Sequence, residues 1–162
     1  MNEIQPVVIT RAFKAPVEKV WAALTEEEQL KKWWGPKDFT APHITVDLRV
    51  GGKYLFAMHG PAGTEFDQDM WSTGTYEEIV PLKRLVYSDS FADAEGNIVP
   101  PSAYGMTDME EVQQVTIELE SLPDGSTQMT LTHEGAAPGE NADNMADGWN
   151  QSLDKLAASV EA

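Results

Sequence analysis

The sequence predicts an α+β fold: a curved antiparallel sheet wraps around a long C-terminal helix, with two short helices after the first strand. Alternating apolar and polar residues, broken by turn residues, fill the chain from about residue 42 to 135, and a helical pattern returns after Pro138. A sheet with one apolar face must cover it, and the last helix is the only large amphipathic element left. The length fits one domain over residues 1–162.

The chain is predicted to begin with a strand followed by an amphipathic helix. Residues 7–14 (VVITRAFK) are rich in β-branched and aromatic side chains, which favours a strand. Pro16 suits the first position of a helix. The residues that follow it at spacings of three and four predict one buried helix face, and they are Val17, Val20, Trp21 and Leu24.

A second short helix is predicted to end at two adjacent tryptophans. Thr25 and Glu28 have the spacing of a capping box, which would begin this helix, and a Gly-Pro pair after the tryptophans would stop it. A helix turns by about 100° per residue, so Trp33 and Trp34 cannot point in one direction. We therefore expect one indole in the core and the other nearer a cavity.

The middle of the chain predicts an antiparallel meander whose strands each have one apolar face. Apolar side chains alternate with other residues along 53–59 and 115–120. Residues 112–121 and 126–134 flank a Pro-Asp-Gly turn, which predicts a hairpin. Residues 92–111 are instead rich in Ala, Asp, Pro and Gly, and there we expect a long mobile loop near an opening.

The last part of the chain predicts a long amphipathic helix. Past Pro138, apolar residues recur at spacings of three or four, and they are Ala142, Met145, Trp149, Leu153 (or Leu156) and Val160. Acidic residues gather near the expected start of this helix and Lys155 lies toward its end, which suits the helix dipole.

The composition excludes several classes of function. The chain has no cysteine, which removes disulfides, thiolate nucleophiles and thiolate metal ligands. Its net charge is −16, and this charge repels phosphate backbones and anionic lipids, so we expect no nucleic-acid or membrane partner. No apolar run approaches the roughly 20 residues of a membrane helix, and no secretory signal is evident. A cytoplasmic location is therefore expected.

Six short motifs in a fixed order carry a resemblance to a known family. They are RAFKAP at residues 11–16, WWGP at 33–36, DLRVGG at 47–52, GTYEEI at 74–79, LTH at 131–133 and GW at 148–149. On these motifs nearly the whole chain resembles the bacterial proteins named for the Hsp90 ATPase activator homology domain. That family lies in the START-like (Bet v 1-like) helix-grip superfamily, also called SRPBCC. The resemblance implies a cavity between the long helix and the sheet, often used for apolar or aromatic ligands.

The candidate ligand-binding residues are mostly aromatic and thioether side chains that could line such a cavity. They are Trp34, Phe39, Tyr54, Phe56, Met58, Met70, Trp71, Tyr76, Tyr87, Tyr104, His133, Met145 and Trp149. Any one of them could equally fill an ordinary core. The polar anchors expected at the walls or mouth of the cavity are Tyr54, Tyr76, Tyr104 and His133.

His133 is the single weak candidate for catalysis. It follows Met129 and Leu131 at a period of two, which predicts that it points to the apolar face, and imidazole suits acid–base chemistry near neutral pH. The alternative is a structural, hydrogen-bonded histidine, because no nearby sequence feature supplies a second catalytic group. The three histidines lack the spacing of a metal motif, so neither a metal nor a cofactor is expected.

Three functions stay open at this point. The favoured one is a protein that binds a small apolar or aromatic molecule without catalysis. The second is a cyclase-like, aromatase-like or hydrolytic enzyme that uses His133 or a tyrosine as acid or base. The third is a chaperone-interacting, stress-response module that uses the acidic half of the chain. The ligand is not identified, and a homodimer is one alternative for the oligomeric state.

Overall fold

The computed structural model describes residues 6–105, 109–136 and 140–161, and they form seven strands and four helices. The elements in chain order are β1 (Val7–Phe13), α1 (Val17–Thr25), α2 (Glu27–Trp33), β2 (Thr40–Val46), β3 (Lys53–His59), β4 (Asp69–Val80), β5 (Arg84–Ala92), the 3-10 helix η1 (Pro101–Tyr104), β6 (Met109–Ser121), β7 (Thr127–Ala136) and α3 (Glu140–Val160).

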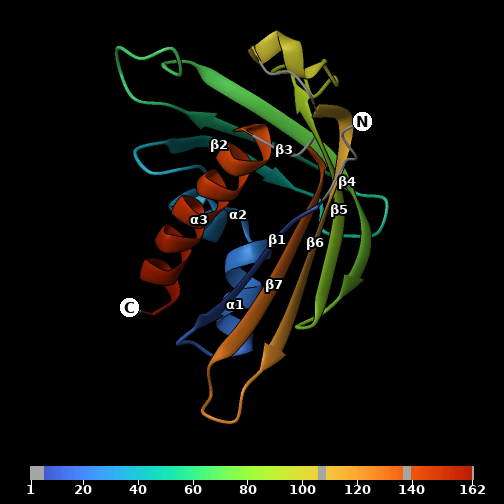
Figure 1. The fold of residues 1–162 in the computed structure, drawn as a ribbon. Coiled ribbons are helices and arrows are strands. Elements are labelled where there is room, and N and C mark those ends of the chain that lie inside the picture. Colours follow the sequence, from blue (N-terminus) through green and yellow to red (C-terminus); the bar gives the residue numbers. More distant parts are fainter. Residues whose placement is uncertain (1–5, 106–108, 137–139, 162) are drawn as a thin grey trace.

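The strands form one antiparallel sheet in the order β1-β7-β6-β5-β4-β3-β2. Strand β1 therefore lies at one edge of the sheet. It pairs with β7, the last strand in the chain, from Val7↔His133 to Phe13↔Thr127. Figure 1 shows the curved sheet with α3 along its concave side and α1 beneath that helix. This is the helix-grip arrangement that the sequence predicts, and the hairpin expected around the Pro-Asp-Gly turn is β6–β7.

The two short helices are present, but they begin differently from what the sequence predicts. Pro16 precedes α1 as its N-cap instead of occupying its first turn. Thr25 does not cap α2, because its hydroxyl donates a 2.8 Å hydrogen bond back to the Trp21 carbonyl and Glu26 takes the cap position without a side-chain bond. The predicted capping box is wrong, since Thr25 still belongs to α1.

Polar contacts attach helix α3, and the residue that follows it, to the β1 edge of the sheet. Arg11 on β1 forms a 2.7 Å ion pair with Asp154, and the Glu161 carboxylate accepts a 3.0 Å bond from the Lys14 amide. The apolar face of its C-terminal half is fully buried, with Leu153 and Leu156 among the least exposed side chains. The predicted amphipathic helix is therefore confirmed, and its C-terminal half belongs to the core.

The segment expected as a loop is partly ordered into structure. Ala92 forms an isolated bridge with Ile98, and η1 follows directly before Gly105. Residues 106–108 lie outside the described residues. The expectation of a long irregular loop over 92–111 is thus wrong for the part that β5, η1 and β6 occupy.

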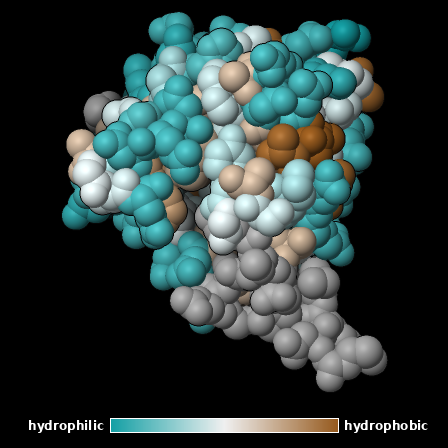
Figure 2. All heavy atoms as spheres, turned by 90° about the horizontal axis from the view of Figure 1, so that it is seen from above, coloured by the Kyte–Doolittle hydropathy of each residue, from teal (hydrophilic) through white to brown (hydrophobic). Residues whose placement is uncertain are grey.

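The face of the molecule that is seen from above is mostly polar (Figure 2). Figure 2 looks onto the molecule from above and shows mainly hydrophilic residues with one compact hydrophobic patch. Large apolar side chains that are exposed on the molecule include Val8, Val50, Ile98 and Val112. Among the helices that the structure describes, none is both long enough and apolar enough to cross a membrane.

Candidate functional site

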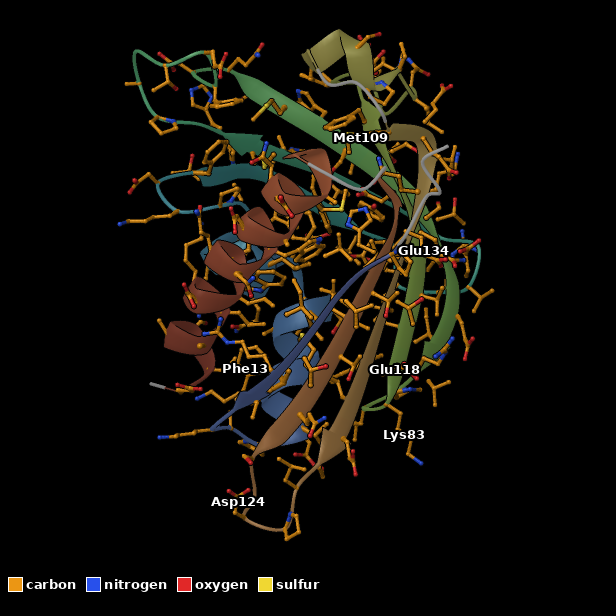
Figure 3. All side chains as sticks on the ribbon, in the orientation of Figure 1. Phe13, Lys83, Met109, Glu118, Asp124 and Glu134 are labelled. Carbon is orange, nitrogen blue, oxygen red and sulfur yellow. The ribbon has the colours of Figure 1, made fainter. Side chains whose placement is uncertain are left out.

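A cavity of about 530 Å³ lies between the N-terminal half of α3 and the upper halves of strands β3 to β7. Its apolar lining comes from Trp34, Pro36, Met58, Phe66, Met70, Trp71, Phe91, Met109, Met145 and Trp149. Its polar lining comes from Ser72, Asp89, Ser90, Gln113, His133, Asn144 and Ser152. In Figure 3, Met109 lies at the upper end of the sheet and Phe13, a core residue, at the lower end. The cavity therefore occupies one end of the grip and the packed core the other.

The adjacent tryptophans divide between core and cavity, as the sequence predicts. Trp33 is 1% exposed, and its indole N–H donates a 2.8 Å hydrogen bond to the carbonyl of Ala23. Trp34 has extended backbone after the last turn of α2, which turns its ring toward the cavity. There the ring packs edge-on against Phe56 at 4.7 Å and Trp149 at 5.8 Å between centroids.

The segment after Trp34 is held against α3 by polar contacts. Gly35 adopts a φ of 98°, a left-handed conformation that ends the helix and that side chains rarely adopt. Lys155 donates 3.2 Å hydrogen bonds to the carbonyls of Pro36 and Phe39, and Gln151 accepts one of 3.0 Å from the Lys37 amide. Partial burial lowers the pKa of Lys155, against an opposing effect of Asp38. These bonds fix one wall of the cavity to the helix.

The structure brings about half of the predicted site residues together at the cavity. The lining includes Trp34, Met58, Met70, Trp71, His133, Met145 and Trp149. Four others, Tyr54, Phe56, Tyr76 and Tyr87, are at most 5% exposed and surround a space of only about 10 Å³. Those four form a packed aromatic cluster beside the cavity, which is the core alternative that the sequence left open for each of them.

Phe39 and Tyr104 line neither space. The Tyr104 hydroxyl donates a 2.7 Å bond to the Ala92 carbonyl and accepts a 3.1 Å bond from the Trp71 amide, so it ties η1 to β4 and β5. The Phe39 ring lies 5.9 Å from the ring of Phe66, which does line the cavity. Both residues support the walls from outside.

His133 lies at the cavity wall in a defined tautomer. The Trp149 indole N–H can only donate, and it lies 2.9 Å from Nδ1 of His133. The proton of the imidazole is therefore on Nε2, which donates to Oε1 of Gln113 at 2.7 Å. Burial lowers the pKa of His133 to about 4, so the ring is neutral at physiological pH. His133 is thus a hydrogen-bonded histidine, which was the alternative to a catalytic role, and it also faces the cavity.

Asp89 is the site residue that the sequence reasoning missed. One of its carboxylate oxygens, Oδ1, accepts a 2.8 Å hydrogen bond from the Tyr54 hydroxyl, and the other, Oδ2, lies 3.9 Å from Nε2 of His133. Burial raises the pKa of Asp89 to about 6, although the bond from Tyr54 opposes this. Tyr54, expected as an anchor on the wall, instead positions this carboxylate from below.

Strand register assembles Asp89, Gln113 and His133 from three neighbouring strands. Asp89 on β5 pairs with Gln113 on β6, and His133 on β7 pairs with Val115, two residues further along β6. Gly135 makes room for the Gln113 amide, because a Cβ at that position would lie 2.4 Å from Gln113 Cγ. One signal in the sequence pointed to Asp89: it follows Tyr87 at a period of two, so a charged side chain falls on an apolar face.

The lining gives the site a one-sided electrostatic character. Among the described residues that line the cavity, Asp89 is the only acidic or basic one, apart from the neutral His133. Among the described residues, no group of three or more His, Asp or Glu is arranged to hold a metal ion. The arrangement can therefore surround an apolar body and offer it one carboxylate, one amide and several hydroxyls.

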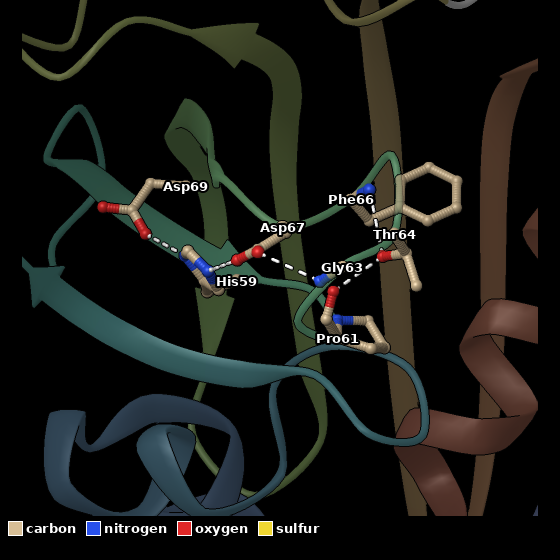
Figure 4. A network of polar contacts seen from close by, with 7 residues as sticks. All are labelled: His59, Pro61, Gly63, Thr64, Phe66, Asp67 and Asp69. Carbon is tan, nitrogen blue, oxygen red and sulfur yellow. Dashed lines mark hydrogen bonds and ion pairs between the residues drawn. The ribbon is translucent and has the colours of Figure 1, made fainter.

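A second polar cluster holds the β3–β4 loop that supplies Phe66 to the cavity. In this cluster, which we call the His59 clasp, the ring nitrogens of His59 contact Asp69 Oδ1 at 2.7 Å and Asp67 Oδ1 at 2.8 Å (Figure 4). Asp67 Oδ2 accepts a 3.1 Å bond from the Gly63 amide. Hydrogen bonds to Asp69 and then Asp67 raise the pKa of His59, so the clasp favours the imidazolium.

Comparison with solved structures finds the same fold in bacterial proteins. A protein from Chromobacterium violaceum is 30% identical, with a TM-score of 0.78 over 97% of both chains. A protein from Nitrosomonas europaea is 26% identical, with a TM-score of 0.76 over 96% of this chain and 94% of that one. A protein from Arthrobacter aurescens is also 26% identical, with a TM-score of 0.75 over 98% of this chain and 91% of that one.

The comparison of the sequence with protein families gives a match over almost the whole chain. A search of the curated proteins finds no match. The family model described as "Activator of Hsp90 ATPase homolog 1-like protein" matches residues 14–161, which include every described residue that lines the cavity. Together with the bacterial structures, this match shows that the chain belongs to the family of activator of Hsp90 ATPase homolog 1-like proteins.

Proposed function

We propose that this protein binds a small apolar or aromatic molecule in the cavity between α3 and the sheet. The observation that carries the proposal is the cavity itself, whose volume of about 530 Å³ lies in the range of small-molecule sites, roughly 300–1,000 Å³. Tryptophan, phenylalanine and methionine side chains form most of its wall, and they suit an apolar ligand.

The contrast between the cavity and the packed aromatic cluster beside it supports this proposal. The aromatic cluster around Tyr54 leaves a space of only about 10 Å³, so the protein fills its interior where nothing is to be bound. Next to this cluster, the rings of Trp34 and Trp149 pack in a T-shaped, edge-to-face arrangement beside an open volume. A large apolar surface that remains uncovered is costly in water, and a ligand that covers it gains that free energy.

The test is the binding of N-phenyl-1-naphthylamine, a neutral probe whose fluorescence rises in apolar surroundings. Met145→Trp fills part of the cavity. It should weaken binding of the probe by about tenfold or more, because the indole occupies space in which the probe would contact the wall. Asn150→Trp is the matched control, because it adds the same indole to an exposed position of α3 outside the lining. Equal binding by both variants, or no binding by the wild-type protein, contradicts the proposal.

A second candidate function is catalysis on the bound molecule, and Asp89 is the observation that favours it. Its pKa of about 6 suits a general base near neutral pH, and it lies beside His133 at the cavity wall. Incubation of the protein with a metabolite extract, followed by mass spectrometry, separates the two functions. A binding protein releases its ligand unchanged, whereas an enzyme depletes it and forms a product, and Asp89→Asn should then abolish turnover.

A further inference from the structure

One carboxylate oxygen of Asp89 faces the cavity and has no hydrogen-bond donor within bonding distance among the described residues. Oδ1 of Asp89 is bound to the Tyr54 hydroxyl, whereas Oδ2 lies 3.9 Å from the nearest described ring nitrogen, beyond hydrogen-bond distance. The N–H on that nitrogen, Nε2 of His133, is already donated to Gln113. The Asp89 side chain remains 22% exposed, so a molecule in the cavity can reach it.

The walls around this carboxylate carry π faces and no positive charge. No lysine or arginine is among the described residues that line the cavity. Lys155 on α3 has its ammonium group bonded to the carbonyls of Pro36 and Phe39. Trp34, Trp71 and Trp149 are the ring type that attracts cations best. Carboxylate and indole therefore select for the same sign of charge.

We propose that the ligand is an amine: an apolar or aromatic body that carries one protonated nitrogen, which pairs with Asp89. This inference rests on the proposed binding function and gives the chemical class of its ligand. An anionic ligand would place its charge beside Asp89 where little water screens the repulsion. A neutral ligand would leave Oδ2 of Asp89 desolvated with no donor of equal strength. The net charge of −16 attracts the same cations over longer distances.

The experiment compares three molecules of nearly one shape that differ in charge. Isothermal titration calorimetry with 1-naphthylmethylamine, 1-naphthalenemethanol and 1-naphthoate is done at about pH 7.5, where the amine is protonated. The wild-type protein should bind the amine on the order of tenfold more tightly than the alcohol, and the carboxylate most weakly.

Two variants locate the source of this preference. Asp89→Asn keeps the shape of the side chain but removes its charge, so the amine and the alcohol should then bind within about twofold of each other. Glu120→Gln is the matched control, because it removes one negative charge from an exposed position on β6 outside the lining, and it should keep the preference. Circular dichroism checks that each variant is folded.

Each outcome decides either the inference or the function beneath it. If the alcohol binds as tightly as the amine to the wild-type protein, the amine inference is overturned while the proposed binding function stands. If Glu120→Gln loses the preference as fully as Asp89→Asn does, the long-range charge is responsible and the inference is again overturned. If none of the three molecules binds and N-phenyl-1-naphthylamine does not bind either, the proposed function itself fails. The wild-type series alone decides the question if Asp89→Asn does not fold.

Discussion

The indole N–H of Trp149 donates a 2.9 Å hydrogen bond to Nδ1 of His133, and this bond joins α3 to β7 across the cavity wall. It also determines the chemistry of the imidazole, since it leaves the proton on Nε2 and directs that proton to Gln113. A helix and a strand of the sheet thus meet at the cavity through a polar contact between two side chains. The position of the helix and the tautomer of the histidine depend on each other.

Replacing Trp149 with Phe should therefore change both stability and the state of His133. The variant keeps an aromatic ring against Trp34 but loses the hydrogen bond, so the free energy of unfolding should fall by about 1 kcal/mol. The ¹⁵N shifts of the His133 ring should move toward a mixture of tautomers. Trp34→Phe is the control, and ring shifts of His133 that move as much in that variant would contradict the role assigned to the bond.

The pair Asp89 and His133 predicts a pH dependence in which the two residues oppose each other. The folded pKa of His133, about 4, lies below its unfolded value of about 6.5. As the pH falls, His133 is protonated in the unfolded chain before it is protonated in the folded protein. Stability is therefore lost as the pH falls from 6.5 to 4. The folded pKa of Asp89, about 6, lies above its unfolded value of about 3.9. The folded protein takes up that proton first and gains stability as the pH falls.

Single variants should separate these two effects. Relative to wild type, Asp89→Asn should lose about 2 to 3 kcal/mol of unfolding free energy between pH 6 and 4, because the His133 effect is left alone. His133→Gln should gain a similar amount over the same range, because the Asp89 effect is left alone. Urea unfolding at several pH values measures both. If the unfolding free energy of both variants changes with pH in parallel with that of the wild type, the two effects do not come from Asp89 and His133.

Two glycines of the site should respond to alanine with opposite signs. Gly135 has a φ of 129° and a Cβ there would meet the Gln113 side chain, so Gly135→Ala should lower the unfolding free energy by about 1 to 3 kcal/mol. In Gly148→Ala the new Cβ would lie 3.7 Å from Pro36 Cγ, an ordinary contact. A helical glycine costs about 0.5 to 1 kcal/mol relative to alanine, so that variant should be more stable. Chemical denaturation tests both, and a loss of stability in Gly148→Ala would show that the wall is tighter than the contacts indicate.

The His59 clasp predicts that the β3–β4 loop loosens as the pH rises. The pKa of His59 is raised, so the contribution of the imidazolium is complete below the unfolded value of about 6.5 and is lost as the pH rises through the folded value. The bond from the Gly63 amide, followed by that from His59, lowers the pKa of Asp67, so its contribution is lost only in strong acid. NMR titration should place the His59 midpoint above 6.5, with faster exchange of the Gly63 amide above that midpoint. Asp67→Asn should lower the midpoint, and an unchanged value would contradict the clasp.

Local patterns in the sequence were sufficient for most of the fold. Alternation along 115–120 predicted the buried face of β6, and the three-and-four spacing after Pro138 predicted α3. Alternation along 53–59 was correct for Tyr54 and Phe56 but not for Ala57, which is 0% exposed. The tryptophan pair is divided between core and cavity as predicted, but the predicted reason was wrong, because Trp34 lies just past α2 and its extended backbone turns the ring toward the cavity. The Thr25 cap was predicted wrongly because α1 continues one residue further and its own hydrogen bonds engage the hydroxyl.

The sequence by itself therefore determined the fold class, the buried faces and the direction of His133, because each depends on a period of two or of about 3.6 residues. Only the tertiary structure decided that Asp89 stands beside His133, that Tyr54 lies beneath the cavity and that Phe39 lies outside it. Those positions depend on the register between β5, β6 and β7 and on the depth to which each side chain packs. Both are set by contacts between residues far apart in the chain, which no local pattern contains.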